Sequence, residues 1–259
     1  MLIQLLRNSG NLTVPQMLMM CIIMFFALAV SFSFHEFMHA FVADWLGDDT
    51  PRLYGRVTMN PLAHLDPMGT ILLLLVGFGW GKPVMYNPSR LKRFKSRRLM
   101  NIMVSLAGVF GNFLVALVSM IIASIIMFAT GFPTTVPVID CSLYFAAGIA
   151  GQAGVPFYGA VFCWLFYYTF IFSMSLMAFN LLPIPPLDGF HVIEQLFPVK
   201  VTYSDGFRSF ARYGPMVLMV LIILGDFGRF DVLGTIMGFI QMPAMLLINT
   251  IAGLIGYLG

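Results

Sequence analysis

The chain has 259 residues, of which 59% are hydrophobic and 10% are charged, and its mean hydropathy is +0.91. This balance excludes an ordinary soluble domain. The net charge of +3 is modest, so the positions of the charged residues along the chain are more informative than the net charge itself. The apolar runs are long and unbroken rather than alternating, which argues against an outer-membrane barrel. The sequence therefore predicts an all-α integral membrane protein, a polytopic helical bundle.

The first predicted element is a membrane span over about residues 15–46. Residues 13–16, Thr-Val-Pro-Gln, have the spacing of a helix capping box with Pro in the first turn, and an apolar run follows to about Trp45. The preceding residues lack the basic start and small-residue cleavage site of a secretory signal, so we expect no cleaved leader. The C-terminal half of this span contains the sequence His35-Glu-Phe-Met-His39.

A shorter apolar segment, over about residues 68–86, is predicted to enter the membrane and turn back. Its apolar run is too short for a helix that crosses a hydrocarbon core of about 30 Å, and it ends in the Gly-rich stretch GFGWGKP. Such backbone is stable at membrane depth only inside protein or beside a wet cavity, because its amides otherwise lack partners. We predict a membrane-embedded, re-entrant segment that resembles a β-hairpin.

The rest of the chain is predicted to add further apolar helices to the same domain, which covers residues 1–259. Their predicted ranges are about 99–130, 157–182, 213–225 and 232–258. The range 213–225 is short for a span, so the total is four or five. Gly234 and Gly238 form a small-xxx-small face that suits close helix packing, either within the chain or in a homo-oligomer.

The basic residues predict the orientation of the chain. Seven of the fourteen lysines and arginines lie between Lys82 and Arg98, and the loop after the third span carries Lys200, Arg208 and Arg212. Both loops lie on one side of a two-span hairpin, as the positive-inside rule requires of the cytoplasmic side of a cell membrane. We expect these loops to contact anionic headgroups, not nucleic acid. The HEFMH sequence then lies toward the cytoplasmic half, and the N-terminus lies outside.

The HEFMH sequence has the spacing of a metal site. His35 and His39 are four residues apart, so on a helix both imidazoles can reach one metal ion, and Glu36 beside them can take a proton from water. Ionisable side chains in the hydrocarbon region are costly unless they have partners, and they are functional candidates by default. The alternative, two histidines at this spacing by chance, is disfavoured by that cost.

A catalytic zinc ion has three protein ligands and an open position, so a third ligand is required. The candidates near membrane depth are His64, Asp66, Asp188 and His191. Asp188 follows a Pro-Pro break at the end of the third span, where non-helical backbone can turn a carboxylate inward. On position alone, Asp188 is the best candidate.

Two motifs together resemble a known family. HEFMH, followed about 150 residues later by Asn180-Leu-Leu-Pro-Ile-Pro-Pro-Leu-Asp-Gly189, is similar to the HExxH and N-x-x-P-x-x-x-L-D-G signatures of the site-2 protease family of intramembrane zinc metalloproteases. The stretches NPLAHLDPMGT and GWGKPV look like its short prokaryotic members without a PDZ or CBS domain. Two positions depart from the family pattern: Val109 stands where Pro is frequent, and Phe190 stands where a small residue is common.

The resemblance implies a set of roles. One zinc ion per chain would be bound by His35, His39 and Asp188, with Glu36 as the general base. Asn180 would hold substrate or stabilise the oxyanion, although a cap at the end of its helix is the other interpretation.

His191 and His64 are the two remaining histidines, and each has more than one expected role. His191 shares a helical face with Asp188, so it can orient that carboxylate, replace it as a ligand, or be an interfacial surface histidine. For His64 we expect a loop-anchoring or site-lining role close to the ligands.

The substrate of such an enzyme would be a transmembrane protein, cleaved within or next to a membrane segment. A helix hides each carbonyl in a hydrogen bond, so the substrate has to unwind locally before attack. The Gly-rich end of the re-entrant segment offers a strand edge that can accept an extended peptide by β-addition. We therefore predict substrate contacts at Gly77, Gly79, Trp80 and Gly81.

Two other functions are open at this point. Broken helices with buried His and Asp also describe ion or metal transporters, although the sequence shows no inverted repeat. A catalytically silent relative that acts as a membrane scaffold would not need Glu36 to bind metal, so Glu36 favours an enzyme. We expect the partners to be a transmembrane substrate and membrane lipid.

Overall fold

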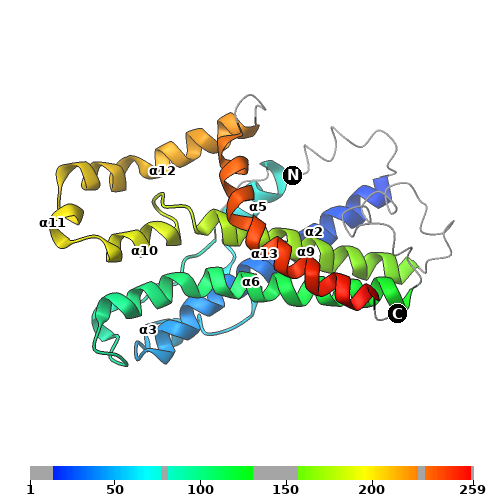
Figure 1. The fold of residues 1–259 in the computed structure, drawn as a ribbon, viewed down its shortest axis with the longest axis horizontal. Helices are drawn as coiled ribbons and strands as arrows, with labels where there is room; N and C mark the ends of the chain where they lie inside the picture. The colour runs from blue at the N-terminus through cyan, green and yellow to red at the C-terminus, as the bar shows by residue number, and fades with distance from the viewer. Residues whose placement is uncertain (1–13, 77–80, 131–156, 227–230, 258–259) are drawn as a thin grey trace.

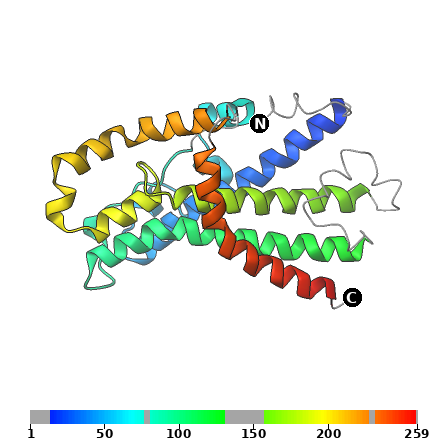
Figure 2. The same cartoon turned by 45° about the horizontal axis from the view of Figure 1, so that its top comes forward.

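The fold centres on three long helices that lie side by side. The computed structural model describes residues 14–76, 81–130, 157–226 and 231–257. The central helices are α2 (Val14–Trp45), α6 (Arg97–Ala129) and α9 (Phe157–Asn180). Each of them contacts the other two, as Figures 1 and 2 show from two directions. The predicted cap at Thr13 lies outside the described residues.

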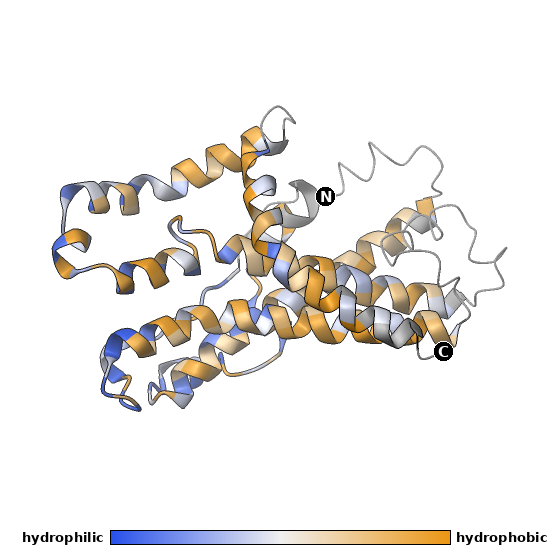
Figure 3. Cartoon of the chain, in the orientation of Figure 1, coloured by the Kyte–Doolittle hydropathy of each residue, from blue (hydrophilic) through white to orange (hydrophobic). Residues whose placement is uncertain are grey.

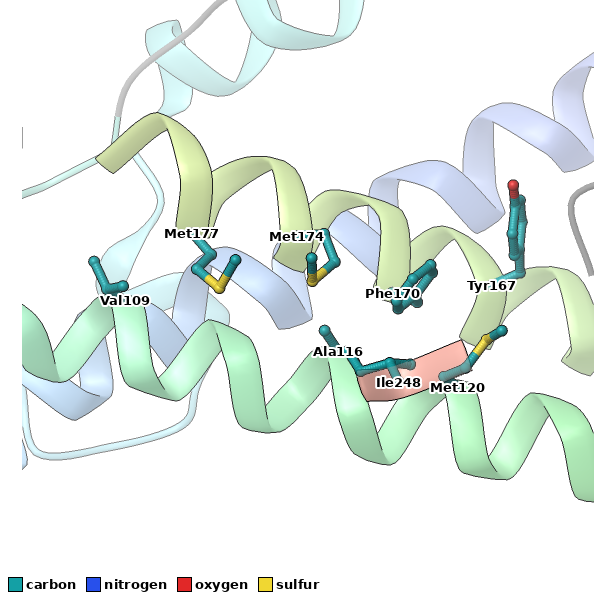
Figure 4. Packing of buried hydrophobic residues seen from close by; sticks show 8 residues of the cluster. All are labelled: Val109, Ala116, Met120, Tyr167, Phe170, Met174, Met177 and Ile248. Atoms are coloured by element: carbon teal, nitrogen blue, oxygen red, sulfur yellow. The ribbon is translucent and has the colours of Figure 1, made fainter. Parts of the chain in front are cut away.

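Buried side chains hold α6 and α9 together. Figure 4 shows Met174 and Phe170 of α9 packed toward Ala116 of α6, with Ile248 of α13 (Val232–Tyr257) closing the cluster. Ala116 is fully buried, and its small side chain allows close approach of the neighbouring helices. Val109, which replaces the Pro of the family pattern, lies in this cluster within an uninterrupted α6.

Four helices of the described residues are long and apolar enough to cross a membrane. They cover Met17–Trp45, Arg97–Ala129, Tyr158–Asn180 and Asp205–Gly225. The fourth belongs to α12 (Asp205–Asp226), which begins eight residues before the predicted range 213–225 and so gains the length of a span. α13 has a shorter apolar stretch, Val232–Ile248, and Pro243 inside it removes one helical hydrogen bond.

The prediction of a hairpin-like segment over residues 68–86 is not confirmed. Its first half is a helix, α5 (Pro67–Val76), which at ten residues is about 15 Å long, half the thickness of a hydrocarbon core of about 30 Å. Asp66 starts this helix, because its carboxylate accepts from Gly69 N at 2.9 Å and Pro67 occupies the first helical position. The chain is described again at Gly81, which pairs with Leu65 in an isolated antiparallel bridge.

Asp48 fastens the end of α2 to the segment that follows Gly81. Gly47, at a φ of +107°, ends α2 in a conformation that favours glycine. The fully buried carboxylate of Asp48 then accepts from Thr50 N at 3.1 Å, at the start of α3 (Thr50–Leu53), and from Asn87 N. The chain between Gly81 and Asn87 is thereby held against α2. Two further short helices flank it, α4 (Pro61–His64) and the 3-10 helix η1 (Pro88–Arg90).

The helices after α9 form an arm at one end of the bundle. α10 (Asp188–Leu196) packs on α6, and α11 (Val199–Thr202) turns the chain into α12, an arrangement visible in Figure 1. Phe190, the second departure from the family pattern, stacks on Phe207 with ring centroids 5.4 Å apart and so docks α10 on α12. A small residue at position 190 would leave this contact unmade.

Polar residues gather at the same end of the molecule. Figure 3 shows them at α3, at the start of α6, and around α11 and the start of α12. Both basic stretches predicted to lie in loops are found there. The described residues are thus a helical bundle with one polar end, and α10 lies at that end.

Candidate metal centre

Three side chains from two helices converge in the bundle. His35 and His39 lie one turn apart on α2, and Asp188 is the first residue of α10. The two Nε2 atoms are 3.0 Å apart, and Asp188 Oδ2 lies 3.3 Å from Nε2 of His35 and 3.2 Å from Nε2 of His39. A tetrahedral zinc ion with ligands at about 2.0–2.1 Å holds them about 3.3 Å apart. The triangle therefore has the size of a zinc site.

The far nitrogens of both imidazoles have partners on α6. His39 Nδ1 lies 2.7 Å from Val104 O, and a carbonyl can only accept, so Nδ1 carries the proton and the neutral ring presents a lone pair at Nε2. His35 Nδ1 lies 3.1 Å from Nδ2 of the fully buried Asn112, whose Oδ1 has no partner, so turning this amide by about 180° exchanges the two atoms and pairs Oδ1. With its oxygen toward Nδ1, Asn112 accepts from His35 and satisfies both groups. The lone pairs of both Nε2 atoms then face Asp188.

Three facing lone pairs repel one another unless positive charge lies between them. Asp188 Oδ2 is buried and makes no hydrogen bond, although it lies within ion-pair distance of both histidines. Burial by itself would raise the pKa of the Asp188 carboxyl, but positive charge on the neighbouring His39 and hydrogen bonds from His35 and His39 outweigh burial and lower that pKa, so positive charge at this point keeps Asp188 a carboxylate. A proton can serve two of these atoms, whereas one metal ion serves all three. The donor set fits a metal ion.

Two glycines allow this close approach. A Cβ on Gly108 of α6 would lie 2.5 Å from His35 Cε1 and closer still to His39 Nε2. A Cβ on Gly189 would lie 2.6 Å from the carbonyl carbon of Leu181, so only glycine lets α10 turn back over the end of α9. The L-D-G sequence therefore has a steric reason here: it brings Asp188 to α2.

A cavity of about 260 Å³ opens beside the three ligand candidates. Because each water molecule occupies roughly 30 Å³, this cavity has room for several of them. Residues from α2, α6, α9, α10 and the two connecting segments line it: His35, Glu36, His39, Pro83, Val84, Tyr86, Val104, Ser105, Asn180, Pro186, Asp188 and His191. Glu36 is buried in this wall, and its Oε2 accepts from Val84 N at 3.2 Å.

Two further sequence candidates, Asn180 and His191, lie in the cavity wall. Asn180 is at the end of α9, and its Nδ2 donates to Leu176 O at 2.9 Å, which leaves its oxygen uncommitted among the bonds observed. His191 lies 3.6 Å from Glu194 and is half-exposed, outside the group of three ligand atoms. Both positions agree with contact to a bound substrate or to water.

Two other candidates lie away from the cavity. The ring of His64 is fully buried and bonds to Thr58 O at 2.8 Å, while its backbone O accepts from Lys82 N at 2.8 Å, so His64 anchors the loop. Gly81 packs against Phe32 and does not line the cavity. Gly77, Gly79 and Trp80 lie outside the described residues.

Sequence reasoning missed several contributors to this site, among them Val104, Gly108, Asn112 and Tyr86. The sequence Ala-Gly-Val-Phe-Gly-Asn, residues 107–112, offered one signal, because a buried Asn inside an apolar span needs a polar partner. Nothing in the sequence distinguishes Val104, which contributes only its backbone oxygen.

Comparison with known proteins gives a consistent set of relatives. The sequence model of peptidase family M50 matches residues 23–222. "Putative zinc metalloprotease YwhC" of Bacillus subtilis is 36% identical over 200 residues, which are 76% of this chain and 78% of that protein. "Putative zinc metalloprotease Rip2" of Mycolicibacterium smegmatis is 24% identical over 205 residues, 77% of this chain and 66% of that protein. No solved structure matches the chain.

Proposed function

Because this chain belongs to peptidase family M50, the site-2 protease family, and is a multi-pass membrane protein, we propose that it is an intramembrane zinc metalloprotease. It hydrolyses a peptide bond within or next to a transmembrane segment of a membrane protein. The observation that carries the proposal is the convergence of His35, His39 and Asp188 on one point, with Glu36 in the wall of the same cavity.

In this proposal each side chain has a defined task. His35, His39 and Asp188 would hold one zinc ion per chain. When bound, this ion would lower the pKa of a water molecule toward about 7 and polarise the scissile carbonyl. Glu36 takes a proton from the attacking water and passes it to the leaving amine. Asn180, in the cavity wall beside Asp188, contacts the substrate backbone.

Glu36 also separates this proposal from a silent scaffold. Its carboxylate lines the cavity, whereas a scaffold that only bound metal would have no use for an acidic group there. Hydrolysis does need it, because a base has to accept the proton of water close to the reacting carbonyl.

The proposed orientation places this cavity in the cytoplasmic half of the cell membrane. The polar end of the bundle contains both basic stretches and is the end at which α10 lies, as Figure 3 shows. Water then reaches the cavity from that end, where Asp44, Asp48 and Asp49 follow the HEFMH sequence of α2. The basic residues contact anionic lipid headgroups.

The experiment compares wild type, Glu36→Gln and Asp188→Ala in detergent, with zinc content and cleavage of single-span membrane proteins measured on the same samples. We expect Glu36→Gln to keep its zinc and to lose cleavage by about 100-fold or more, because it removes the base alone. Asp188→Ala should lose both. Cleavage that survives in Glu36→Gln would eliminate the proposed base, and full zinc occupancy in Asp188→Ala would eliminate the third ligand.

A further inference from the structure

Tyr86 lies in the cavity wall and has no task in the mechanism above. It follows Val84, whose backbone N donates to the Glu36 carboxylate at 3.2 Å, and it precedes Asn87, whose backbone N donates to the buried Asp48. Of the two acceptors, Glu36 lies in α2 and Asp48 lies three residues after the end of α2. The backbone on either side of Tyr86 is therefore fixed to the helix that carries the proposed base, which makes its position in the cavity well defined.

Tyr86 lies between an apolar cluster and the cavity. The ring packs on a buried apolar cluster of α2 and α6 that includes Ala43 and Val104. Tyr86 and Asp188 line the same cavity. Burial first, and then the negative charges of Asp188, Glu194 and Asp48, raise the pKa of Tyr86. The phenol keeps its proton at neutral pH and so can donate a hydrogen bond.

Peptide hydrolysis requires such a donor. Attack on the scissile carbonyl moves negative charge onto its oxygen, and a donor already aimed at that oxygen lowers the barrier because no reorganisation is needed. Among the other donors of the described wall, Asn180 Nδ2 bonds to Leu176 O and Val84 N bonds to Glu36, while the Ser105 hydroxyl and the His191 ring also line the cavity. Tyr86 brings a neutral O–H group on a rigid aromatic stem.

We propose that Tyr86 is a further catalytic residue, whose hydroxyl donates a hydrogen bond to the oxygen of the scissile carbonyl as negative charge develops there. This inference rests on the proposed proteolytic function. The balance of the reaction is unchanged: the C–N bond breaks, water supplies OH to the carbonyl carbon, and its other proton travels through Glu36 to the amine. Tyr86 keeps its own proton throughout.

The test uses Tyr86→Phe, which keeps the ring packing and removes only the hydroxyl. Tyr54→Phe is the matched control, because Tyr54 is 70% exposed and lies outside the cavity. With a membrane-protein substrate that wild type cleaves, we expect Tyr86→Phe to lower kcat by about 100-fold or more at an unchanged KM, with unchanged zinc content. Tyr54→Phe should match wild type.

A second measurement separates catalysis from structure. A phosphinic peptide imitates the charged tetrahedral oxygen, so Tyr86→Phe should bind it about 100-fold more weakly than wild type. In a Glu36→Gln background, which does not turn over, the affinity for uncleaved substrate should be the same with Tyr86 or Phe at this position.

Several results would overturn the inference. A kcat within about twofold of wild type, a change confined to KM, or loss of zinc from Tyr86→Phe would each remove the oxyanion role and leave the proposed function intact. Absence of cleavage by wild type across the substrate panel would overturn the proposed function, and this inference with it.

Discussion

His35 and His39 differ in what fixes their rings, and this difference matters for the metal. His39 is oriented by a backbone carbonyl, Val104 O, which no substitution at that residue removes. His35 is oriented by a side chain, the buried amide of Asn112. Partners of this kind set the ring tautomer and raise the basicity of the ligand. Asn112 is therefore the residue outside the ligand set on which zinc affinity depends most directly.

Replacing Asn112 by Leu should weaken zinc binding by about 10- to 100-fold, because His35 Nδ1 loses its acceptor while the side-chain volume is nearly kept. Asn112→Asp retains an acceptor oxygen and should retain most of the affinity. The measurement is competition for zinc with a calibrated chelator in detergent. Asn101→Leu, on the same helix but beside Gln195, is the control and should bind as wild type does. Equal affinity in Asn112→Leu would show that Asn112 does not orient the ligand.

At the scale of elements, the site depends on how separate segments are fastened to α2. Gly108 lets α6 reach both imidazoles, and Gly189 lets α10 turn back over α9. The segment from Gly81 to Asn87 is held at one end by the bridge to Leu65 and at the other by Asp48. Different contacts therefore position the three parts of the cavity, which are α6, α10 and the segment from Gly81 to Asn87.

Asp48→Ala should loosen this segment without removing the metal. It removes the buried carboxylate to which the backbone N–H groups of Thr50 and Asn87 donate, and a hydrogen bond to a charged group contributes about 1.5–3 kcal/mol. We expect faster hydrogen exchange over residues 81–90, lower kcat and unchanged zinc content. Asp49→Ala is the neighbouring control, since Asp49 makes only an exposed pair with Arg90, worth at most about 1 kcal/mol. Identical exchange in both variants would refute the fastening role of Asp48.

At the scale of the whole molecule, the motifs were predictable and their supports were not. The HEFMH spacing predicted that His35 and His39 share a site, and the Pro-Pro break together with the family resemblance singled out Asp188 among four candidates; the structure brings these three side chains together. The helix α5 was missed because a short apolar run before glycines favours a turn, whereas Asp66 and Pro67 start a helix. Tyr86 and Val104 were missed because their roles arise only when distant segments meet.

The orientation of the whole molecule is also testable. In a cysteine-free background, Lys95→Cys, two residues before α6 begins, probes the polar end of the bundle. Tyr158→Cys, near the start of α9, probes the opposite end, where Gly159 lies close to Thr130 at the end of α6. With a membrane-impermeant maleimide on intact cells, we expect labelling of Tyr158→Cys and labelling of Lys95→Cys only after permeabilisation. The reverse pattern would place the cavity on the outer side of the membrane.

The measurement that tests the central claim most directly is a zinc titration of the metal-free protein, with bound zinc and cleavage of one membrane substrate followed together. The account predicts that both rise in parallel and saturate at one zinc ion per chain in wild type. Glu36→Gln should bind the same zinc without cleavage, and Asp188→Ala should show neither tight binding nor cleavage. Cleavage by the metal-free protein, or cleavage that does not follow zinc occupancy, would contradict the claim that this His-His-Asp site performs the reaction.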